Sequence, residues 1–299
     1  MTKAGLSIRR TLHTQPLLAI LALSSSFLGG VASLSTSAPS MSMKNIVVVG
    51  GGVQGTSVAY QLAKKSSTPL KITILESKEP ASAASGKGGG FMARSWGDGT
   101  STQGLHHLAF DMYEDLAKEL GCDSYRKLPV LSVAPEGGGG IQQNKKNELM
   151  PSWLDGKSIG RISPMGYGDD TAQITPKEFV LKMLEAKSDD ISVVLGTCTG
   201  VVVDDEEGDD ELRVTGVTFM PRGSDGEEEI LEADAVVVSA GPWSCQAEDW
   251  FEGSGIQLPM EGVKSTSIVW KQPDGEEVTD ATALFCGEDY RFDTHCRFC

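Results

Sequence analysis

The pattern of apolar and polar residues predicts a β-α-β unit near the start of the chain. Residues 45–49 and residues 71–75 are dominated by branched apolar side chains and predict two strands. Between them, apolar residues recur at helical spacing, so a helix is expected over residues 53–65. Three consecutive glycines, from Gly50 to Gly52, separate the first strand from this helix. These glycines form either a flexible loop without a specific role or a turn that another group must approach closely.

The rest of the pattern predicts two more helices and a series of short strands. Helices are expected over residues 104–120 and 175–187. The second opens with Thr175 as N-cap and Pro176 at its first position, and Glu178 follows the cap by three residues, as in a capping box. Strands are expected over residues 128–136, 191–196, 200–204, 212–220, 230–234 and 235–241, and β character resumes over 256–270.

The strands after residue 191 have the pattern of an antiparallel meander that returns to one buried strand. That last strand, residues 235–239, is a continuous apolar run, which is typical of a central position in a parallel sheet. Two acidic runs, residues 204–211 and 223–234, separate the strands. We interpret them as solvated hairpin loops rather than a metal site, because carboxylates on a flexible loop are not held convergent.

Composition and charge exclude some classes of function. The chain has 299 residues, of which 39% are hydrophobic and 22% charged, as in globular proteins. A net charge of −15 without a Lys/Arg cluster argues against binding nucleic acid by neutralising phosphates. The six cysteines are widely spaced and predict no disulfide framework. The C-x-x-C at residues 296–299 has no second ligand pair, so no metal is predicted.

The first 43 residues resemble a targeting segment and are excluded from the fold. Up to residue 43 they contain no acid; they begin with Lys3, Arg9 and Arg10 and continue with an apolar stretch over residues 17–23. Small residues follow at positions 31–33, as at the cleavage site of an export signal. We therefore expect the secretory pathway or an organelle, such as a plastid, with mitochondrial or cytoplasmic locations as alternatives. No stable membrane span is expected once the leader is removed.

The glycines after the first strand form a G-x-G-x-x-G motif. Gly50 permits a tight turn, Gly52 lets the backbone approach a pyrophosphate, and Gly55 lets the helix pack closely on the strand. The helix N-terminus then offers N–H groups and a positive dipole end to the phosphates. Glu76 ends the second strand, where a carboxylate can accept hydrogen bonds from a ribose. Together these features predict a dinucleotide site.

The β-α-β unit does not choose between nicotinamide and flavin cofactors, because both carry an adenosine diphosphate. A nicotinamide-dependent dehydrogenase would add a second cofactor unit or a catalytic Tyr-x-x-x-Lys or Cys arrangement, and we find none of these in the sequence. The loop over residues 77–100, SKEPASAASGKGGGFMARSWGDGT, is long and rich in glycine and serine. A compact domain tolerates such a loop mainly when it is functional.

Four segments carry a resemblance to a known family. They are VVVGGGVQGTSVAYQLAKK, ILESKEPASAASGKGGGFMARSW, TPKEFVLKMLEA followed by LGTCTGVVV, and ADAVVVSAGPWS. In this order they resemble the FAD-dependent oxidoreductases of the D-amino-acid oxidase and sarcosine oxidase (DAO) superfamily, over roughly residues 44–295. The SGKGGGF stretch is most similar to a eukaryotic branch that includes a yeast protein implicated in endosome-to-Golgi traffic.

The resemblance implies FAD as cofactor and a set of residues that bind it. The loop after the second strand would wrap the ribityl chain, and the main chain of Cys198, where the family usually has valine, would meet the adenine. Arg94 would pair with a substrate carboxylate, with a surface salt bridge as the alternative. The expected cofactor contacts are Gly50, Gly52, Val53, Gln54, Gly55, Glu76, Ser77, Ser85, Gly86, Lys87, Gly88, Gly89, Cys198, Ala240 and Gly241.

Several residues of types that are common in active sites have a simpler interpretation as surface, capping or packing residues. Lys87 is equally well explained as a solvated loop lysine. His106 and His107 stand at a helix start, where histidines are mostly surface or cap residues, and Trp243 is interpreted as packing. We name no catalytic base, because the flavin performs the difficult chemistry.

The resemblance also implies an α/β fold (α+β overall), in which a Rossmann-like FAD-binding domain is interleaved with an antiparallel-sheet substrate domain. The FAD-binding parts are expected at residues 44–125 and 166–250, and the substrate parts at 126–165 and 251–299. The implied activity is oxidation of a small amine or amino acid by hydride transfer to FAD. The alternative is a flavin-binding protein without robust catalysis, acting in trafficking or as a truncated product.

The family ordinarily continues beyond the segments matched here. Further substrate-domain strands and a last glycine turn over the flavin follow in its members, whereas this sequence stops after DTHCRFC. The resemblance therefore implies a chain that is truncated at its C-terminus. Neither the oligomeric state nor the substrate's identity is predicted.

Overall fold

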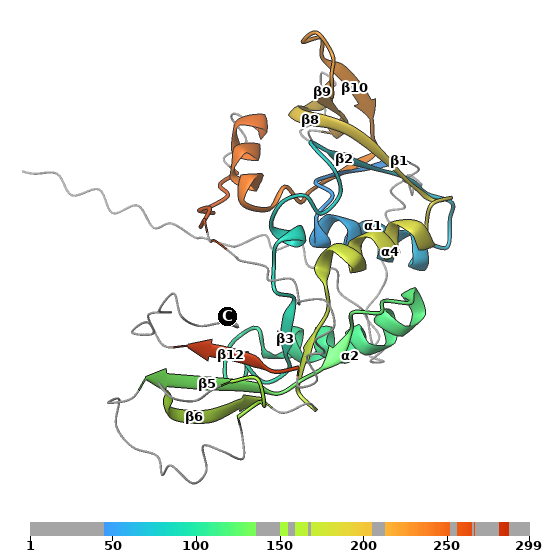
Figure 1. The fold of residues 1–299 in the computed structure, drawn as a ribbon. Helices are drawn as coiled ribbons and strands as arrows, with labels where there is room; N and C mark the ends of the chain where they lie inside the picture. The colour runs from blue at the N-terminus through green and yellow to red at the C-terminus, as the bar shows by residue number, and fades with distance from the viewer. Residues whose placement is uncertain are drawn as a thin grey trace, which may run out of the picture. The chain divides into compact units, whose positions relative to one another are not determined.

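A computed structural model of the chain describes residues 45–135, 150–154, 159–166, 169–204, 213–251, 256–264, 266 and 281–286 (Figure 1). All of these belong to one compact unit. The leader predicted over residues 1–43, the first acidic run beyond Asp204 and the C-x-x-C motif fall outside these ranges. The export leader and the location that it implies therefore stay predictions.

A six-stranded sheet holds the predicted β-α-β unit. Its order is β10-β9-β8-β2-β1-β11, in which β8, β2, β1 and β11 run parallel and β8, β9 and β10 form an antiparallel meander. The fold class expected from the sequence is confirmed. The strands are β1 (Asn45–Val49), β2 (Lys71–Glu76), β8 (Ile191–Asp204), β9 (Arg213–Pro221), β10 (Glu229–Glu232) and β11 (Ala235–Val238).

One long strand joins the parallel and antiparallel halves of this sheet. Residues 191–195 of β8 pair with β2, and residues 196–204 pair with β9. Two separate strands, residues 191–196 and 200–204, were predicted here. In the structure the strand is continuous, and Gly196 lies where a side chain would collide with the Phe219 ring of β9, whose Cδ2 lies 2.5 Å from an ideal Cβ. The glycine thus marks a close contact between strands rather than a turn.

Three helices pack into two apolar layers with this sheet. Helix α1 (Val53–Lys65) lies on the face formed by Ile46, Val48, Ile72 and Ile74. Helix α4 (Pro176–Ala186) packs on α1 and on α2 (Gln103–Leu120) through a second cluster that includes Tyr60, Phe179 and Met183 (Figure 1). In the described part of the chain, no helix is both long and apolar enough to cross a membrane.

Two small sheets and two 3-10 helices complete the described structure. One sheet has the order β12-β5-β6, and the other has the order β3-β7-β4. Whether these elements divide into the two predicted domains stays a prediction. The elements are β3 (Phe91–Ala93), β4 (Arg126–Lys127), β5 (Val130–Pro135), β6 (Ile159–Gly166), β7 (Thr171–Gln173), β12 (Ala283–Cys286), η1 (Ala84–Gly86) and η2 (Gly241–Phe251).

Two strand predictions are wrong in position or in kind. Strand β11 was expected in the centre of the parallel sheet, but among the described strands it pairs with β1 alone and lies at the edge. An apolar run reports burial of both faces of a strand, which says nothing about its lateral neighbours. Residues 256–264, expected as β structure, form no strand; Met260 N–H donates to the Leu258 carbonyl at 2.6 Å, closing a tight turn around Pro259.

The capping box predicted for α4 is replaced by a longer-range contact. Thr175 is the N-cap residue, but its side chain makes no capping hydrogen bond. Glu178 accepts hydrogen bonds from Asp123 N–H at 2.9 Å and from Ser124 N–H at 3.1 Å, and also from the Ser124 hydroxyl. Thr175 N–H in turn donates to Ser124 Oγ at 2.8 Å. The carboxylate therefore joins α4 to the end of α2 instead of closing its own first turn.

We predict that Glu178→Ala lowers the free energy of unfolding by about 2 kcal/mol, because two backbone N–H groups lose a charged acceptor. Burial raises the pKa of the Glu178 carboxyl, but hydrogen bonds from Ser124 and Asp123 outweigh burial, and the net pKa lies below the ordinary 4.5. The contribution is thus present above pH 4.5 and is lost as pH falls further. Urea unfolding of both proteins at pH 7 and pH 3.5 measures this difference.

The matched control is Glu185→Ala on the same helix. Glu185 is exposed and forms one ion pair with Lys182 at 3.5 Å, so its removal should change stability by less than about 0.5 kcal/mol. Equal effects of the two substitutions would show that the contact between Glu178 and the end of α2 does not stabilise the fold.

Candidate cofactor site

The glycine turn brings the carboxyl ends of three parallel strands together. Gly50 has a φ of +109°, and an ideal Cβ on it would lie 2.3 Å from the Ser239 carbonyl oxygen beyond β11. Its N–H donates to the Leu75 carbonyl of β2 at 2.9 Å. A Cβ on Gly55 would lie 2.1 Å from the Gly50 oxygen, so α1 can start this close to β1 only because both residues are glycines.

Glu76 lies directly against this turn. One carboxylate oxygen, Oε2, accepts a hydrogen bond from Gly51 N–H at 2.8 Å. The other, Oε1, accepts from Lys78 N–H at 3.0 Å and from the Ser77 hydroxyl at 3.3 Å. A carboxylate can accept about four hydrogen bonds, so this fixed group keeps capacity for a ribose hydroxyl. The sequence prediction placed Glu76 and Ser77 at the same end of β2.

Arg222 supports the segment that follows Glu76. Its Nη1 donates to the Lys78 carbonyl at 2.8 Å, and its own N–H donates to the Leu195 carbonyl of β8 at 3.0 Å. Sequence reasoning missed this residue because it is 144 positions from Lys78 and no motif contains it. Its effect is to fix the turn whose N–H groups hold the Glu76 carboxylate.

The first turn of α1 faces the hydroxyl group of Ser85. Val53 N–H donates to Ser85 Oγ at 2.9 Å, and a Cβ on Gly52 would lie 3.1 Å from the same oxygen. The first turn of α1 contains no acidic residue, so the positive end of the helix dipole is not neutralised from within the helix. Bare backbone at Gly52 next to helix N–H groups and a serine hydroxyl matches what a pyrophosphate requires.

The glycine-rich loop after Ser85 is folded back on itself. The N–H groups of Lys87 and Gly88 both donate to the Ala84 carbonyl, at 3.1 and 2.9 Å. A Cβ on Gly86 would lie 1.9 Å from the Ala81 carbonyl oxygen, so this turn has no room for a side chain. The Gly89 carbonyl accepts a hydrogen bond from Gln173 Nε2 at 2.9 Å, which ties the loop to strand β7.

Two other predicted contacts lie at the same edge of the sheet. A Cβ on Gly50 would lie 3.1 Å from the Ala240 Cα, so the turn at Ala240 and Gly241 abuts the glycine motif. Cys198 follows Leu195, the β8 residue that pairs with Glu76, by three positions. Burial raises the pKa of its thiol to about 11, which leaves the thiol neutral at physiological pH. Its predicted main-chain contact with adenine stays a prediction.

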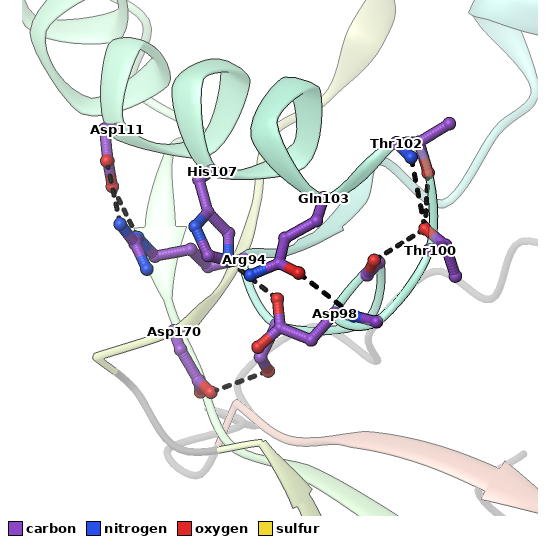
Figure 2. Close-up of polar contacts among 11 residues, drawn as sticks. Arg94, Asp98, Thr100, Thr102, Gln103, His107, Asp111 and Asp170 are labelled. Atoms are coloured by element: carbon purple, nitrogen blue, oxygen red, sulfur yellow. Dashed lines mark hydrogen bonds and ion pairs between the residues drawn. The ribbon is translucent and has the colours of Figure 1, made fainter.

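Arg94 and the two histidines lie in a separate cluster over α2. The Arg94 guanidinium binds Asp111 through two hydrogen bonds, of 2.9 and 3.2 Å, as Figure 2 shows. His107 Nε2 lies 2.7 Å from Asp98 Oδ1, and a Cβ on Gly97 would lie 2.7 Å from the His106 ring. The salt-bridge alternative for Arg94 is therefore realised in this structure, and its contact with a substrate stays a prediction.

A strand, a glycine turn, a helix and an acid at the end of the next parallel strand define a dinucleotide-binding α/β protein. Residues 45–296 match the model of the DAO family, described as "FAD dependent oxidoreductase", and the chain belongs to that family. FAD is therefore its cofactor, as the sequence predicted. The residues that would hold it are the glycine turn, the first turn of α1, Glu76 and the loop from Ser85 to Gly89.

Individual relatives agree with this assignment but are longer than the chain. It is 32% identical over 232 residues to the protein C1F5.03c of Schizosaccharomyces pombe, which covers 72% of this chain and 59% of that protein. It is 28% identical over 247 residues to glycine oxidase of Pseudomonas putida, covering 76% and 62%. L-Amino acid deaminase from Proteus myxofaciens shares the fold, with a TM-score of 0.54, 19% identity and coverage of 77% and 51%.

We predict that Gly52→Ala lowers FAD affinity at least about 10-fold, because the methyl group would stand where the backbone must approach the pyrophosphate. Stability should fall by no more than about 1 kcal/mol, since the φ of −79° suits alanine and only the Ser85 hydroxyl is close. FAD titration, followed by protein fluorescence, and thermal unfolding measure the two effects. Gly104→Ala, where a Cβ meets nothing within 4 Å, is the control and should leave affinity unchanged.

A second prediction concerns Cys198→Val. The raised thiol pKa means that this group's stabilising contribution is complete below about pH 9 and is lost as pH rises toward 11. The valine variant should lack this loss, so that it gains about 1 kcal/mol relative to the parent chain between pH 8 and pH 11, after allowance for partial exposure. FAD affinity should not change if the adenine contact is made by the main chain. Cys245→Val serves as the control, and an identical pH profile in both variants would refute the prediction.

Proposed function

We propose that this protein, an FAD-dependent oxidoreductase, oxidises a small amine or amino acid at the carbon bearing nitrogen. The observation that carries the proposal is the convergence of Gly52, Glu76 and Ser85 at the carboxyl edge of the parallel strands. The names of two similar proteins, a glycine oxidase and an L-amino acid deaminase, favour a substrate with a C–N bond. The activity is proposed for the whole protein, because the chain spans about three-fifths of these relatives at most.

FAD, when bound, would supply the acceptor for a hydride from the substrate carbon while the nitrogen loses a proton; water would hydrolyse the resulting imine to a carbonyl compound and ammonia, and dioxygen or another acceptor would take up the two electrons. The residues of this chain contribute binding and orientation. Glu76 would hold the ribose, the N–H groups at the start of α1 would bind the pyrophosphate, and the loop from Gly86 to Gly89 would place main-chain groups along the rest of the cofactor.

Two spectroscopic observations test the proposal. The purified full chain should bind FAD and show a flavin absorption spectrum, and Glu76→Ala should weaken that binding about 10-fold, because a ribose hydroxyl loses a charged acceptor. A panel of amines and amino acids, added without oxygen, should include a compound that bleaches the flavin. Lys71→Ala, an exposed substitution at the other end of β2, is the control for Glu76→Ala.

The outcomes separate the competing functions. Flavin that binds but is bleached by no compound of the panel would favour a flavin-binding protein without robust catalysis. Colourless protein that cannot be reconstituted with FAD would overturn the proposal for this chain.

A further inference from the structure

Three large aromatic side chains are exposed beside the glycine-rich loop, and one of them, Phe285, contacts the other two. Phe91, Trp96 and Phe285, here called the aromatic cluster, are 45%, 42% and 38% exposed. The ring centroids of Phe91 and Phe285 are 6.3 Å apart, and those of Trp96 and Phe285 are 5.2 Å apart, both edge to face. The cluster unites β3, the loop after it and β12. Exposed apolar side chains that gather from separate segments are typical of a surface that binds another molecule.

The cluster continues onto one face of the sheet β3-β7-β4. Phe91 pairs with Gln173, and Gln173 pairs with Arg126, so these three side chains lie in a row across the three strands on the same face. The opposite face belongs to the interior, where Ala172 is buried and Met92 packs on the core cluster of α2 and α4. The row is therefore an outward-facing surface with an aromatic end and a cationic end.

Gln173 connects this row to the predicted cofactor loop. Its carbonyl oxygen accepts hydrogen bonds from Arg126 Nε at 3.0 Å and Nη2 at 2.7 Å, and its amide nitrogen donates to the Gly89 carbonyl at 2.9 Å. The Phe91 ring lies against the same glycine, whose ideal Cβ would be 2.9 Å from Phe91 Cε2. The aromatic end and the middle of the row thus adjoin the loop expected to run beneath the flavin, and Arg126 is joined to that loop through Gln173.

The two arginines near this loop differ in their partners. Arg94 is neutralised by the carboxylate of Asp111 (Figure 2). Arg126 forms no ion pair with a described residue, and its hydrogen-bond partner is the neutral amide of Gln173. That amide uses two of the five guanidinium N–H groups and orients the plane. Arg126 therefore presents an oriented cation that is not neutralised by its partner, which suits a carboxylate.

We propose that Arg126 binds the carboxylate of an amino-acid substrate whose aromatic or large apolar side chain lies on the aromatic cluster. This inference rests on the proposed function and adds the substrate class. Adjacent strands are about 4.8 Å apart, so Arg126 and Phe91, two strands apart, are separated by roughly 10 Å at their Cα atoms. An amino acid with a ring at one end and a carboxylate at the other spans such a row, whereas glycine would leave the aromatic cluster in water.

The test uses carboxylates without an amino group, which cannot be oxidised, so binding is measured apart from catalysis. 3-Phenylpropionate should bind the full chain at least about 10-fold more tightly than propionate, because only the former covers the aromatic cluster. Dissociation constants for both carboxylates come from isothermal titration calorimetry, without FAD and with FAD present, and quenching of tryptophan fluorescence reports contact of 3-phenylpropionate with the cluster. The quenching by 3-phenylpropionate should be largely lost in Trp96→Phe, which keeps an aromatic ring at the site.

Two variants separate the two ends of the row. Arg126→Gln should weaken both carboxylates about 10-fold or more, while its control Arg213→Gln, at an exposed arginine of β9, should weaken neither. Phe285→Ala should weaken 3-phenylpropionate and leave propionate unchanged, which removes the preference. Its control is Ile230→Ala, at a side chain that is 62% exposed on β10.

Equal affinities for the two carboxylates, or identical behaviour of Arg126→Gln and Arg213→Gln, would overturn the inference. These failures are distinct from failure of the proposed function. A flavin bleached equally by glycine and phenylalanine would leave the oxidoreductase proposal standing and refute the substrate class. If the chain binds 3-phenylpropionate selectively but no amino acid reduces its flavin, the binding inference would stand and the oxidoreductase proposal would be refuted.

Discussion

The structure depends on one close approach of backbone to backbone at Gly50. No side chain fits there, because an ideal Cβ would lie 2.3 Å from the Ser239 oxygen, and the φ of +109° is one that other residues rarely adopt. This contact sets how near β11 lies to the end of β1 and where the chain turns into α1. The position of Gly51 N–H against Glu76 follows from it. A bulkier residue would separate the strands whose ends form the site.

The predicted cofactor site is built largely from main-chain groups held by distant side chains. One carboxylate oxygen of Glu76 accepts a hydrogen bond from Gly51 N–H, and the other accepts one from Lys78 N–H. Arg222 donates to the Lys78 carbonyl and so holds the same turn. Ser85 reaches the first turn of α1 from a loop 32 positions away. Because the groups that would meet FAD are mostly backbone, the side chains that matter are those that set backbone position. Many of them need never touch the cofactor.

Local signals made the β-α-β unit predictable, whereas contacts between distant residues left no local signal in the sequence. The strand and helix bounds around Gly50 follow from hydrophobic spacing, and the position of Glu76 follows from the motif. Strand β7 was not predicted, because its three residues acquire their conformation only by pairing with β3 and β4. Glu178 carried the signal of a local cap, yet Ser124 and Asp123 compete successfully for its carboxylate. A single sequence does not record which partner wins such a competition.

Strand β8 ties the two halves of the large sheet to a common register. It runs from the pairing with β2 to the pairing with β9, and its register against β9 shifts between Cys198 and Gly200 and between Val202 and Val203. Inserting a further residue between the segment paired with β2 and the segment paired with β9 would reverse the face that the following side chains present, and so would expel Val201 from the cluster around Val217 and Phe219. The exposed turn between β9 and β10 has no such constraint. Variation in length is therefore expected at the tip of that hairpin and not within the strand that supports it.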